Sequence, residues 1–315
     1  MMLLIDVVAL TAFLVVAVVL FDYALPATAA LAWLGIGRRR AGLREHRLDL
    51  GSTSLPYLDG GRGAPLVLVH GFGADKDNFC LVAAHLTPHL RVIALDLPGF
   101  GAAPRDLGAR HRIEDQVAHL RTFIHALGLG RMHLGGSSMG GFIVSKYAAA
   151  YPEDVASLWL LAPAGTEAAL DTPLMRHYRK TGEVPLLVNT IGAFAGLLEV
   201  VSHRRSVLPH SMRRRLAQRA VADFELHSQI FREICDDSAL LEPELPGIAA
   251  PTLVVWGAED RVLNAAAAGV IGGLILGSEV VVMPGVGHLP MVERPRAVAR
   301  DYLRFRAERT PASTA

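Results

Sequence analysis

The sequence predicts an α/β fold: a mostly parallel sheet flanked by helices, with a helical cap insertion and an N-terminal transmembrane helix. Short apolar segments rich in β-branched residues recur along the chain and end at Gly, Pro or Asp. Longer amphipathic segments separate most of them, and this alternation is typical of a parallel sheet with helices on both faces. The interval from Ala162 to Pro251 is too long for a simple crossover, which needs only about a dozen residues, and it has the pattern of several helices.

The chain begins with a segment, Met1 to Phe21, that is almost wholly apolar and has Asp6 as its only charged residue. A helix needs about 20 apolar residues to cross a bilayer, so we expect a transmembrane helix over roughly residues 3–23. The alternative is a cleavable signal peptide, because Ala27–Ala29 resembles a cleavage site. The basic region that begins such a peptide is missing, which favours the anchor.

A basic segment follows the apolar one. Its arginines are Arg38, Arg39, Arg40, Arg44 and Arg47. It can form either a helix along an anionic membrane surface or a solvated linker. Positive charge after the span favours a body on the cytoplasmic side. Small residues in the span, Ala9, Ala12 and Ala17, are compatible with packing of a homodimer.

The remaining elements follow from apolar periodicity. We expect buried strands, apolar on both faces, at 65–70, 91–96, 131–136, 155–162, 251–257 and 279–285. We expect helices around 113–127, 139–151, 264–275 and 293–307. The predicted organisation is a transmembrane and juxtamembrane helix at 1–46, a core at 47–165 and 248–310, and a helical cap at 166–247. The cap would cover the carboxyl edge of the sheet, where ligands bind in open α/β sheets.

Two segments of the cap have unusual composition. Residues 184–201 carry one charge, Glu199, and are expected to line an acyl channel, to face lipid, or to form a buried cap helix. Residues 202–219 contain six arginines and no acidic residue. They would attract anionic lipid or form a solvated helix face.

Charge and cysteine content exclude several classes of protein. Lys and Arg number 31 and Asp and Glu number 30, so the overall charge gives no reason to expect nucleic acid as a partner. The only cysteines, Cys80 and Cys235, make no disulfide framework and fit no metal motif, and we expect them to be small buried residues. The sequence predicts neither a metal nor a cofactor.

The segment Gly136-Ser137-Ser138-Met139-Gly140 matches the pattern G-x-S-x-G between an expected strand and an expected helix, the setting that this motif requires. The glycines leave room for a sharp turn, which places Ser138 at the apex with its hydroxyl exposed. Ser137 is expected to point elsewhere and to be structural. Phosphate loops of the G-x-x-x-x-G-K-[ST] type and dinucleotide loops of the G-x-G-x-x-G type do not fit this stretch.

A nucleophilic serine needs a base and an acid that orients the base, and in this architecture the chain order is Ser, Asp or Glu, then His. Asp260 comes directly after one expected strand and His288 after the next. Both would lie at the same sheet edge as Ser138. Glu259 is the alternative acid, and the other histidines compete with His288, whose position after the last strand favours it.

Acyl transfer also needs donors for the developing oxyanion. We expect one to be the backbone N–H of Met139 and the other the N–H of Phe72, in the loop after the first parallel strand. His70 is expected to support this loop rather than to react. Asp96, in a second tight loop, is expected to be a structural anchor.

These residues and their surroundings resemble the α/β-hydrolase fold. The resemblance lies in the segments HGFGADKDNF, DLPGFG, GGSSMGGFIVSKYAAAYPEDVASLWLLAPAG, WGAEDRV and GVGHLPMVERP, over roughly residues 60–165 and 250–297. Together with the N-terminal helix, they are similar to membrane-anchored monoacylglycerol lipases and to bacterial inner-membrane phospholipases A of the PlaF type.

The resemblance implies a catalytic triad of Ser138, Asp260 and His288, with Phe72 and Met139 as oxyanion donors. It also implies attachment to the bacterial inner membrane with a periplasmic body, although the animal relatives face the cytosol and the arginine count favours the cytoplasm.

The predicted function is hydrolysis of carboxylic esters of glycerolipids through an acyl-enzyme, with the lipid bilayer as partner. Serine at the turn argues against the dehalogenases and epoxide hydrolases of the same fold, which use aspartate. Two alternatives remain open. One is a C–C bond hydrolase of ring-cleavage products, for which a membrane anchor would be unusual. The other is a non-catalytic lipid-binding protein on a hydrolase fold, which would not need all three residues of the triad.

Overall fold

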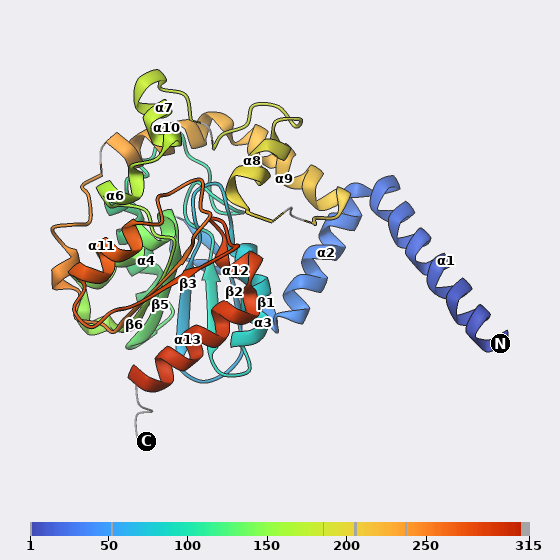
Figure 1. The fold of residues 1–315 in the computed structure, drawn as a ribbon, viewed down its shortest axis with the longest axis horizontal. Helices are drawn as coiled ribbons and strands as arrows, with labels where there is room; N and C mark the ends of the chain where they lie inside the picture. The colour runs from blue at the N-terminus through green and yellow to red at the C-terminus, as the bar shows by residue number, and fades with distance from the viewer. Residues whose placement is uncertain (1, 52, 185, 205–206, 237, 310–315) are drawn as a thin grey trace.

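The computed structural model describes residues 2–309 except 52, 185, 205–206 and 237, and these residues form an eight-stranded sheet (Figure 1). The strands are β1 (Leu43–Asp49), β2 (Ser54–Gly60), β3 (Pro65–Val69), β4 (Arg91–Leu95), β5 (Met132–Ser137), β6 (Val155–Leu161), β7 (Thr252–Gly257) and β8 (Glu279–Met283). Their order across the sheet is β1-β2-β4-β3-β5-β6-β7-β8. Neighbours from β4 to β8 are parallel, whereas β2 pairs antiparallel with both β1 and β4.

All six strands expected from the sequence are present, but β8, an edge strand, is partly exposed rather than buried as predicted. The hairpin of β1 and β2 was not expected. The segment LREHRLD of β1 is polar and mostly exposed, because β1 is the edge strand and pairs only with β2. The predicted boundary of the membrane-proximal part, residue 46, falls within this strand.

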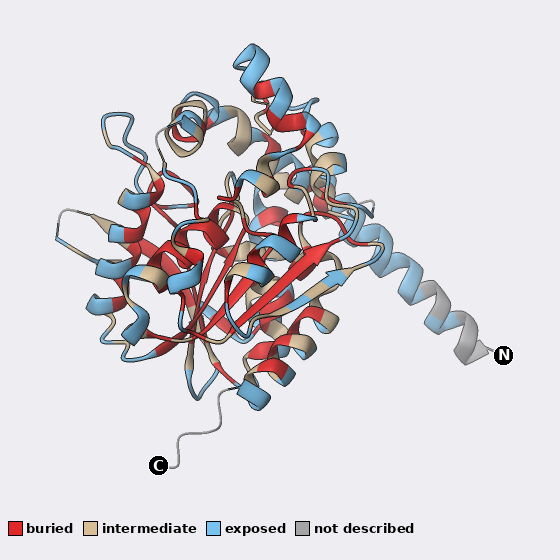
Figure 2. Ribbon diagram, turned by 60° about the vertical axis from the view of Figure 1, so that its left-hand side comes forward, coloured by how far each residue is buried: buried red, intermediate tan, exposed pale blue. Residues whose placement is uncertain are grey.

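Two apolar layers enclose the sheet, whose central strands are buried (Figure 2). Residues of β3 alternate between the layers, as side chains of a strand do. Val67 and Val69 pack with α4 (Ile113–Ala126), α5 (Met139–Ala150) and α11 (Ala267–Leu274). Leu66 and Leu68 pack with α3 (Cys80–Leu86), α12 (Pro290–Glu293) and α13 (Pro295–Arg309). The four helices expected from periodicity are α4, α5, α11 and α13. Cys80 and Cys235 are free thiols, but they are half-buried rather than fully buried as expected.

Within the described residues, the long interval between β6 and β7 contains several helices joined by loops and no strand, which is compatible with the predicted cap. It contains α6 (Glu167–Leu170), α7 (Pro173–Thr181), α8 (Phe194–Val201), α9 (His210–Ala222) and α10 (Phe224–Asp236). These helices lie over one edge of the sheet (Figure 1). Of the six cap arginines, Arg205 lies outside the described residues.

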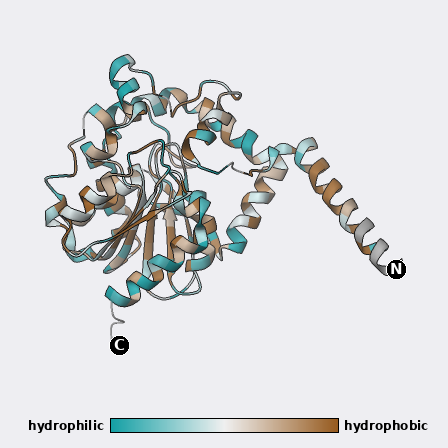
Figure 3. Ribbon diagram, viewed as in Figure 1, coloured by the Kyte–Doolittle hydropathy of each residue, from teal (hydrophilic) through white to brown (hydrophobic). Residues whose placement is uncertain are grey.

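The N-terminal segment forms α1 (Met2–Ala24), an apolar helix that projects from the body (Figure 3). Its described side chains are largely exposed, among them Leu10 and Phe13. No single helix within the described residues has by itself the length and apolar character of a membrane span. The two segments Leu10–Ala24 and Pro26–Arg40 together have the length and apolar character of a span, but the angle between them is 119°. The span over 3–23 remains a prediction, since side chains at 2–5, 8 and 9 lie outside the description.

The basic segment is not a solvated linker: Arg44 and Arg47 lie in β1, and Arg38, Arg39 and Arg40 end a second helix, α2 (Pro26–Arg40). Pro26 begins it, where the missing N–H costs nothing. Asp22, at the bend, accepts a hydrogen bond from Trp33 Nε1 (3.0 Å) and from the backbone N–H of Ser211 at the start of α9 (3.3 Å). The bend is thereby attached to the cap.

Candidate active site

Ser138 lies at the turn between β5 and α5. Its backbone has φ 54° and ψ −119°, a conformation unusual for a residue with a side chain. Three backbone hydrogen bonds hold it: Ser138 N–H donates to the Leu161 carbonyl, and its own carbonyl accepts from Phe142 and Ala164. Such strain costs about 1–3 kcal/mol and persists where the surroundings over-determine it, often at active sites. Ser138 itself is half-buried and lines a cavity that also contains His288.

The glycines beside Ser138 allow backbone segments to approach closely. A Cβ on Gly136 would collide with the Gly140 carbonyl, and a Cβ on Gly140 would collide with the carbonyl oxygen of Val69. The mechanical role predicted for these glycines is confirmed. Ser137 is fully buried, as expected of a structural residue, although its Oγ has no hydrogen-bond partner among the described residues.

Asp260 and His288 meet at the same end of the sheet. His288 Nδ1 lies 2.7 Å from Asp260 Oδ2. Because a carboxylate only accepts, Nδ1 carries the proton, which leaves Nε2 of a neutral imidazole free to accept one. His288 lines the cavity that contains Ser138. The three residues chosen from the sequence are thus brought to one site.

The Asp260 carboxylate is buried and fully engaged. Besides His288, its oxygens accept from Trp256 Nε1 (2.9 Å) and from the backbone N–H groups of Val262 (2.8 Å) and Leu263 (3.0 Å). Burial alone would raise the pKa of this carboxyl, but His288 and the donated N–H bonds hold it below its usual value. An ionised, immobile Asp260 can therefore stabilise a protonated imidazole.

Glu259, the alternative acid, has a different partner. Its Oε2 accepts the backbone N–H of Val286 at 3.0 Å and so ties together two loops at this edge. The sequence did not identify the contribution of Trp256, which lies four residues before Asp260.

The loop after β3 lies against the serine turn. A Cβ on Gly71 would come within 3.1 Å of Ser138 Cβ, so the loop that carries Phe72 passes beside Ser138. Met139 is the first residue of α5, and its N–H therefore lacks a partner within the helix. Both positions are compatible with the oxyanion role expected of them.

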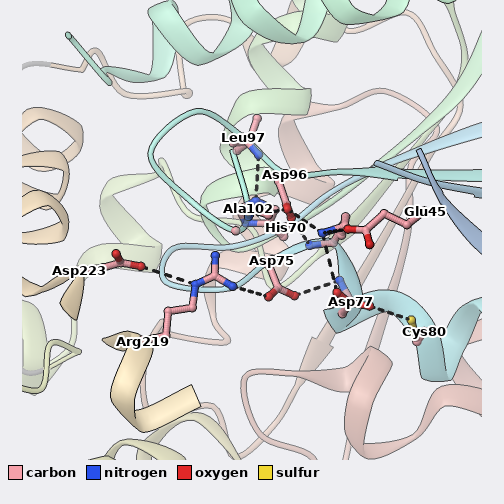
Figure 4. A network of polar contacts seen from close by, with 12 residues as sticks. Glu45, His70, Asp75, Asp77, Cys80, Asp96, Leu97, Ala102, Arg219 and Asp223 are labelled. Carbon is pink, nitrogen blue, oxygen red and sulfur yellow. Dashed lines mark hydrogen bonds and ion pairs between the residues drawn. The ribbon is translucent and has the colours of Figure 1, made fainter. Parts of the chain in front are cut away.

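Two buried side chains hold this loop, as predicted. His70 donates from Nδ1 to the Gly71 carbonyl (2.8 Å) and accepts the Leu97 N–H at Nε2 (3.1 Å). Burial lowers its pKa to about 4, so it is neutral. Asp96 accepts from the backbone N–H of Lys76, from Lys76 Nζ and from Ala102 N–H, each at 2.8 Å. These contacts form part of the network in Figure 4.

Two cavities meet at Ser138. The mixed pocket contains Ser138, His288, apolar cap residues (Leu186, Leu187, Val188, Phe194, Leu197, Leu198) and the polar residues Asp75, Asn78, Arg219, Asp223 and His227. The apolar pocket is lined by Met139, Phe142, Leu170, Leu174, Met175, Phe231 and Ile234 together with Ser138. Phe72 and Leu186 border both. The segment 184–201 thus lines the cavity, one of the roles expected for it. The polar residues of the mixed pocket were not singled out from the sequence.

Comparison with known proteins places these features in context. A family model described as the alpha/beta hydrolase fold matches residues 64–295. Lipase 1 of Psychrobacter immobilis is 36% identical over 277 residues, covering 86% of each chain. Monoacylglycerol lipase ABHD6 of Mus musculus is 30% identical over 261 residues, 78% of each chain. A solved structure described as a membrane phospholipase A, a novel bacterial virulence factor, has a TM-score of 0.88 and 39% identity, covering 98% of this chain and 99% of that one.

Proposed function

The chain belongs to the α/β-hydrolase family, and on this premise we propose that it is a membrane-anchored serine esterase that hydrolyses carboxylic esters of glycerolipids. It is a lipase-type hydrolase, like the lipases and the membrane phospholipase A that it resembles. The observation that carries the catalytic part is the 2.7 Å contact of His288 with Asp260 at the cavity of Ser138.

In the proposed mechanism, Ser138 Oγ attacks the ester carbonyl carbon while its proton passes to His288 Nε2. The N–H groups of Phe72 and Met139 donate to the oxyanion that develops. Collapse releases the alcohol, which takes the proton from His288, and leaves an acyl group on Ser138. Water then attacks this acyl-enzyme, with His288 again as base, and the carboxylic acid departs. Asp260 keeps the imidazole oriented throughout.

Lipid esters are favoured by what surrounds the serine. Both cavities have apolar walls that can hold acyl chains. The apolar helix α1 would place the body beside a bilayer. We propose a single-pass anchor in the bacterial inner membrane. The family resemblance favours a periplasmic body and the arginines of α2 favour a cytoplasmic one. A compartment-specific reporter fused to the C-terminus decides between the two sides.

The catalytic assignment is tested with Ser138→Ala, using Ser137→Ala as the matched control. We expect Ser138→Ala to lower hydrolysis of long-chain monoacylglycerol and lysophospholipid by about 10³-fold or more. Ser137→Ala should retain activity because it removes only an unpaired hydroxyl. Retention of esterase activity in Ser138→Ala would contradict the assignment. A wild-type protein that binds vesicles but cleaves no ester would favour the non-catalytic alternative.

The substrate class is tested separately by comparing the lipids of cells that express wild type or Ser138→Ala. Accumulation of glycerolipids in the variant cells supports the proposal. Unchanged glycerolipids, combined with cleavage of a ring-fission product by the purified wild type, would favour the C–C bond hydrolase.

A further inference from the structure

The mixed pocket has one polar side. Arg219 of α9 reaches the loop after β3, where its Nη1 lies 3.0 Å from Asp75 Oδ2, and its Nε lies 3.5 Å from Asp223 Oδ2 (Figure 4). Asn78, three residues after Asp75, lines the same pocket. These residues contrast with the apolar side chains that line the rest of this pocket and with the apolar pocket that shares Ser138.

Arg219 has a donor that the protein leaves unused. Its Nη2 is buried and has no hydrogen-bond partner among the described residues. Buried polar groups are almost always paired, and an unpaired one calls for an explanation. The side chain as a whole is 25% exposed, so a modest shift of the guanidinium can present this N–H to a ligand in the pocket.

We propose that Arg219, with Asn78 and Asp75, binds the hydroxyl-bearing alcohol part of the ester and so determines specificity for that part. The inference rests on the proposed ester hydrolysis at Ser138 and goes beyond it by naming the residues that recognise the leaving alcohol. The acyl chain then lies in the apolar pocket, where the side chains are almost all hydrocarbon. Ser138, shared by both cavities, stands at the bond between the two parts.

The charges favour a neutral hydroxyl over an anionic head group. Asp75 and Asp223 flank Arg219, and Asp223 also accepts from Arg105 Nε at 2.7 Å. Two carboxylates thus balance two guanidinium groups, and a phosphate would face the repulsion of both carboxylates. A substrate hydroxyl can accept a hydrogen bond from Arg219 and donate one to the Asp75 carboxylate or to the side-chain carbonyl of Asn78. A glycerol bearing free hydroxyls satisfies these groups, and its hydrocarbon can rest on the cap side.

The test uses three esters of one fatty acid at pH 8: the monoacylglycerol, the ethyl ester and the lysophosphatidate. At this pH Asp75 is ionised, because its pKa, raised by burial, is about 6. Arg219→Met removes the donor. Arg214→Met, an exposed arginine on the same helix, is the matched control. Since the donor is charged, we expect kcat/KM for the monoacylglycerol to fall by about ten- to a hundredfold in Arg219→Met, mainly through KM.

The ethyl ester has no hydroxyl, so its kcat/KM should change by less than about twofold in Arg219→Met. An equal loss with both esters would show a merely structural role and would overturn the inference. An unchanged kcat/KM for both the monoacylglycerol and the ethyl ester would overturn it too. A loss confined to the lysophosphatidate would show a phosphate site instead and would overturn it as well.

Two further observations keep these outcomes distinct. Asn78→Ala should leave the contacts of Arg219 with Asp75 and Asp223 in place, so it tests the subsite even if Arg219→Met is unstable. Asn78→Ala should also lower kcat/KM for the monoacylglycerol more than for the ethyl ester. An equal change in kcat/KM for all three esters would contradict the subsite. If wild type cleaves the ethyl ester, ester hydrolysis at Ser138 stands whatever Arg219→Met does, and the glycerolipid substrate is decided by the lipid comparison described above. If wild type cleaves none of the esters, the proposed function fails and the inference fails with it.

Discussion

At the scale of single residues, the site depends on how closely the backbone can pack around Ser138. The strained conformation of Ser138 is held by hydrogen bonds from β6 and from the start of α5. Gly140 is the residue that lets α5 approach the end of β3, because a Cβ there would meet the carbonyl oxygens of Val69 and His70. These carbonyls begin the loop that carries Phe72, so a side chain at Gly140 would displace this loop.

We therefore expect Gly140→Ala to lower the free energy of unfolding by about 1–3 kcal/mol, as overpacking does. Esterase activity should fall more steeply than the folded fraction, because the loop of Phe72 must move away from Ser138. Urea denaturation and the ester assay measure the two effects.

Gly269→Ala is the control, since Gly269 lies in α11 with no atom within 4 Å of an added Cβ. It should stabilise by about 0.5–1 kcal/mol. Equal behaviour of the two variants would contradict the packing argument.

The candidate site was predictable from the sequence where its residues occur in local motifs. Ser138 has a pattern of its own, and Asp260 and His288 follow strands in the expected order. Arg219 could not be found in this way, because its partner Asp75 is 144 residues away and the contact exists only once α9 lies over the loop after β3. Among several cap arginines, only the tertiary structure distinguishes it.

At the scale of elements, the parallel strands were predictable because they are apolar on both faces. The hairpin of β1 and β2 lacks that signal, since β1 exposes most of its side chains. The sequence also left open whether the basic segment is a solvated linker or a docked helix, because arginines at the end of a helix are compatible with both. Its buried face, which includes Ala29 and Ala30, and the Trp33 contact with Asp22 become informative only with α9 in place.

Arg38 of α2 forms ion pairs with Asp77 and Glu45, which help to hold α2 against the body. Arg38 Nε and Nη2 donate to the two oxygens of Asp77 at 2.6 and 2.8 Å, and Nη1 donates to Glu45 at 2.6 Å. Asp77 lies beside Lys76, whose ammonium binds the buried Asp96. Helix α2 is thus connected to the loop that carries Phe72.

Arg38→Ala should destabilise the protein by about 1.5–3 kcal/mol, the range for hydrogen bonds to charged groups. The carboxylate of Asp77, only 12% exposed, would be left without its strongest partner. Thermal unfolding and limited proteolysis of the detergent-solubilised protein measure the effect, with cleavage expected near α2. Arg40→Ala is the matched control, because Arg40 is exposed. A melting temperature that falls equally in both variants would argue against a specific role of the pair.

At the scale of the whole molecule, α1 and the body are distinct in their surroundings. Most described side chains of α1 are apolar and exposed, with Asp22 a buried exception, whereas the apolar side chains of the body are largely enclosed (Figures 2 and 3). An exposed apolar surface of this extent indicates a membrane or a partner. The bend at Leu25 and the attachment of Asp22 to α9 set the cap beside the point where α1 leaves the body. A lipid substrate would therefore meet the cap and its cavities first.

Deletion of residues 2–20 tests this arrangement and retains Asp22 with its contacts to Trp33 and Ser211. We expect the shortened protein to leave the membrane fraction after an alkaline carbonate wash and to lose most activity on vesicle-bound lipid. Its kcat/KM for a soluble short-chain ester should change by less than about threefold, because the deletion removes bilayer anchoring and not groups at the reacting bond. Replacing residues 2–20 with an unrelated apolar span of the same length should restore both membrane attachment and vesicle activity.

If the shortened protein remains in the washed membranes, α1 is not the anchor. If it also loses activity on the soluble ester, α1 supports the body itself, and the separation of anchoring from catalysis is wrong.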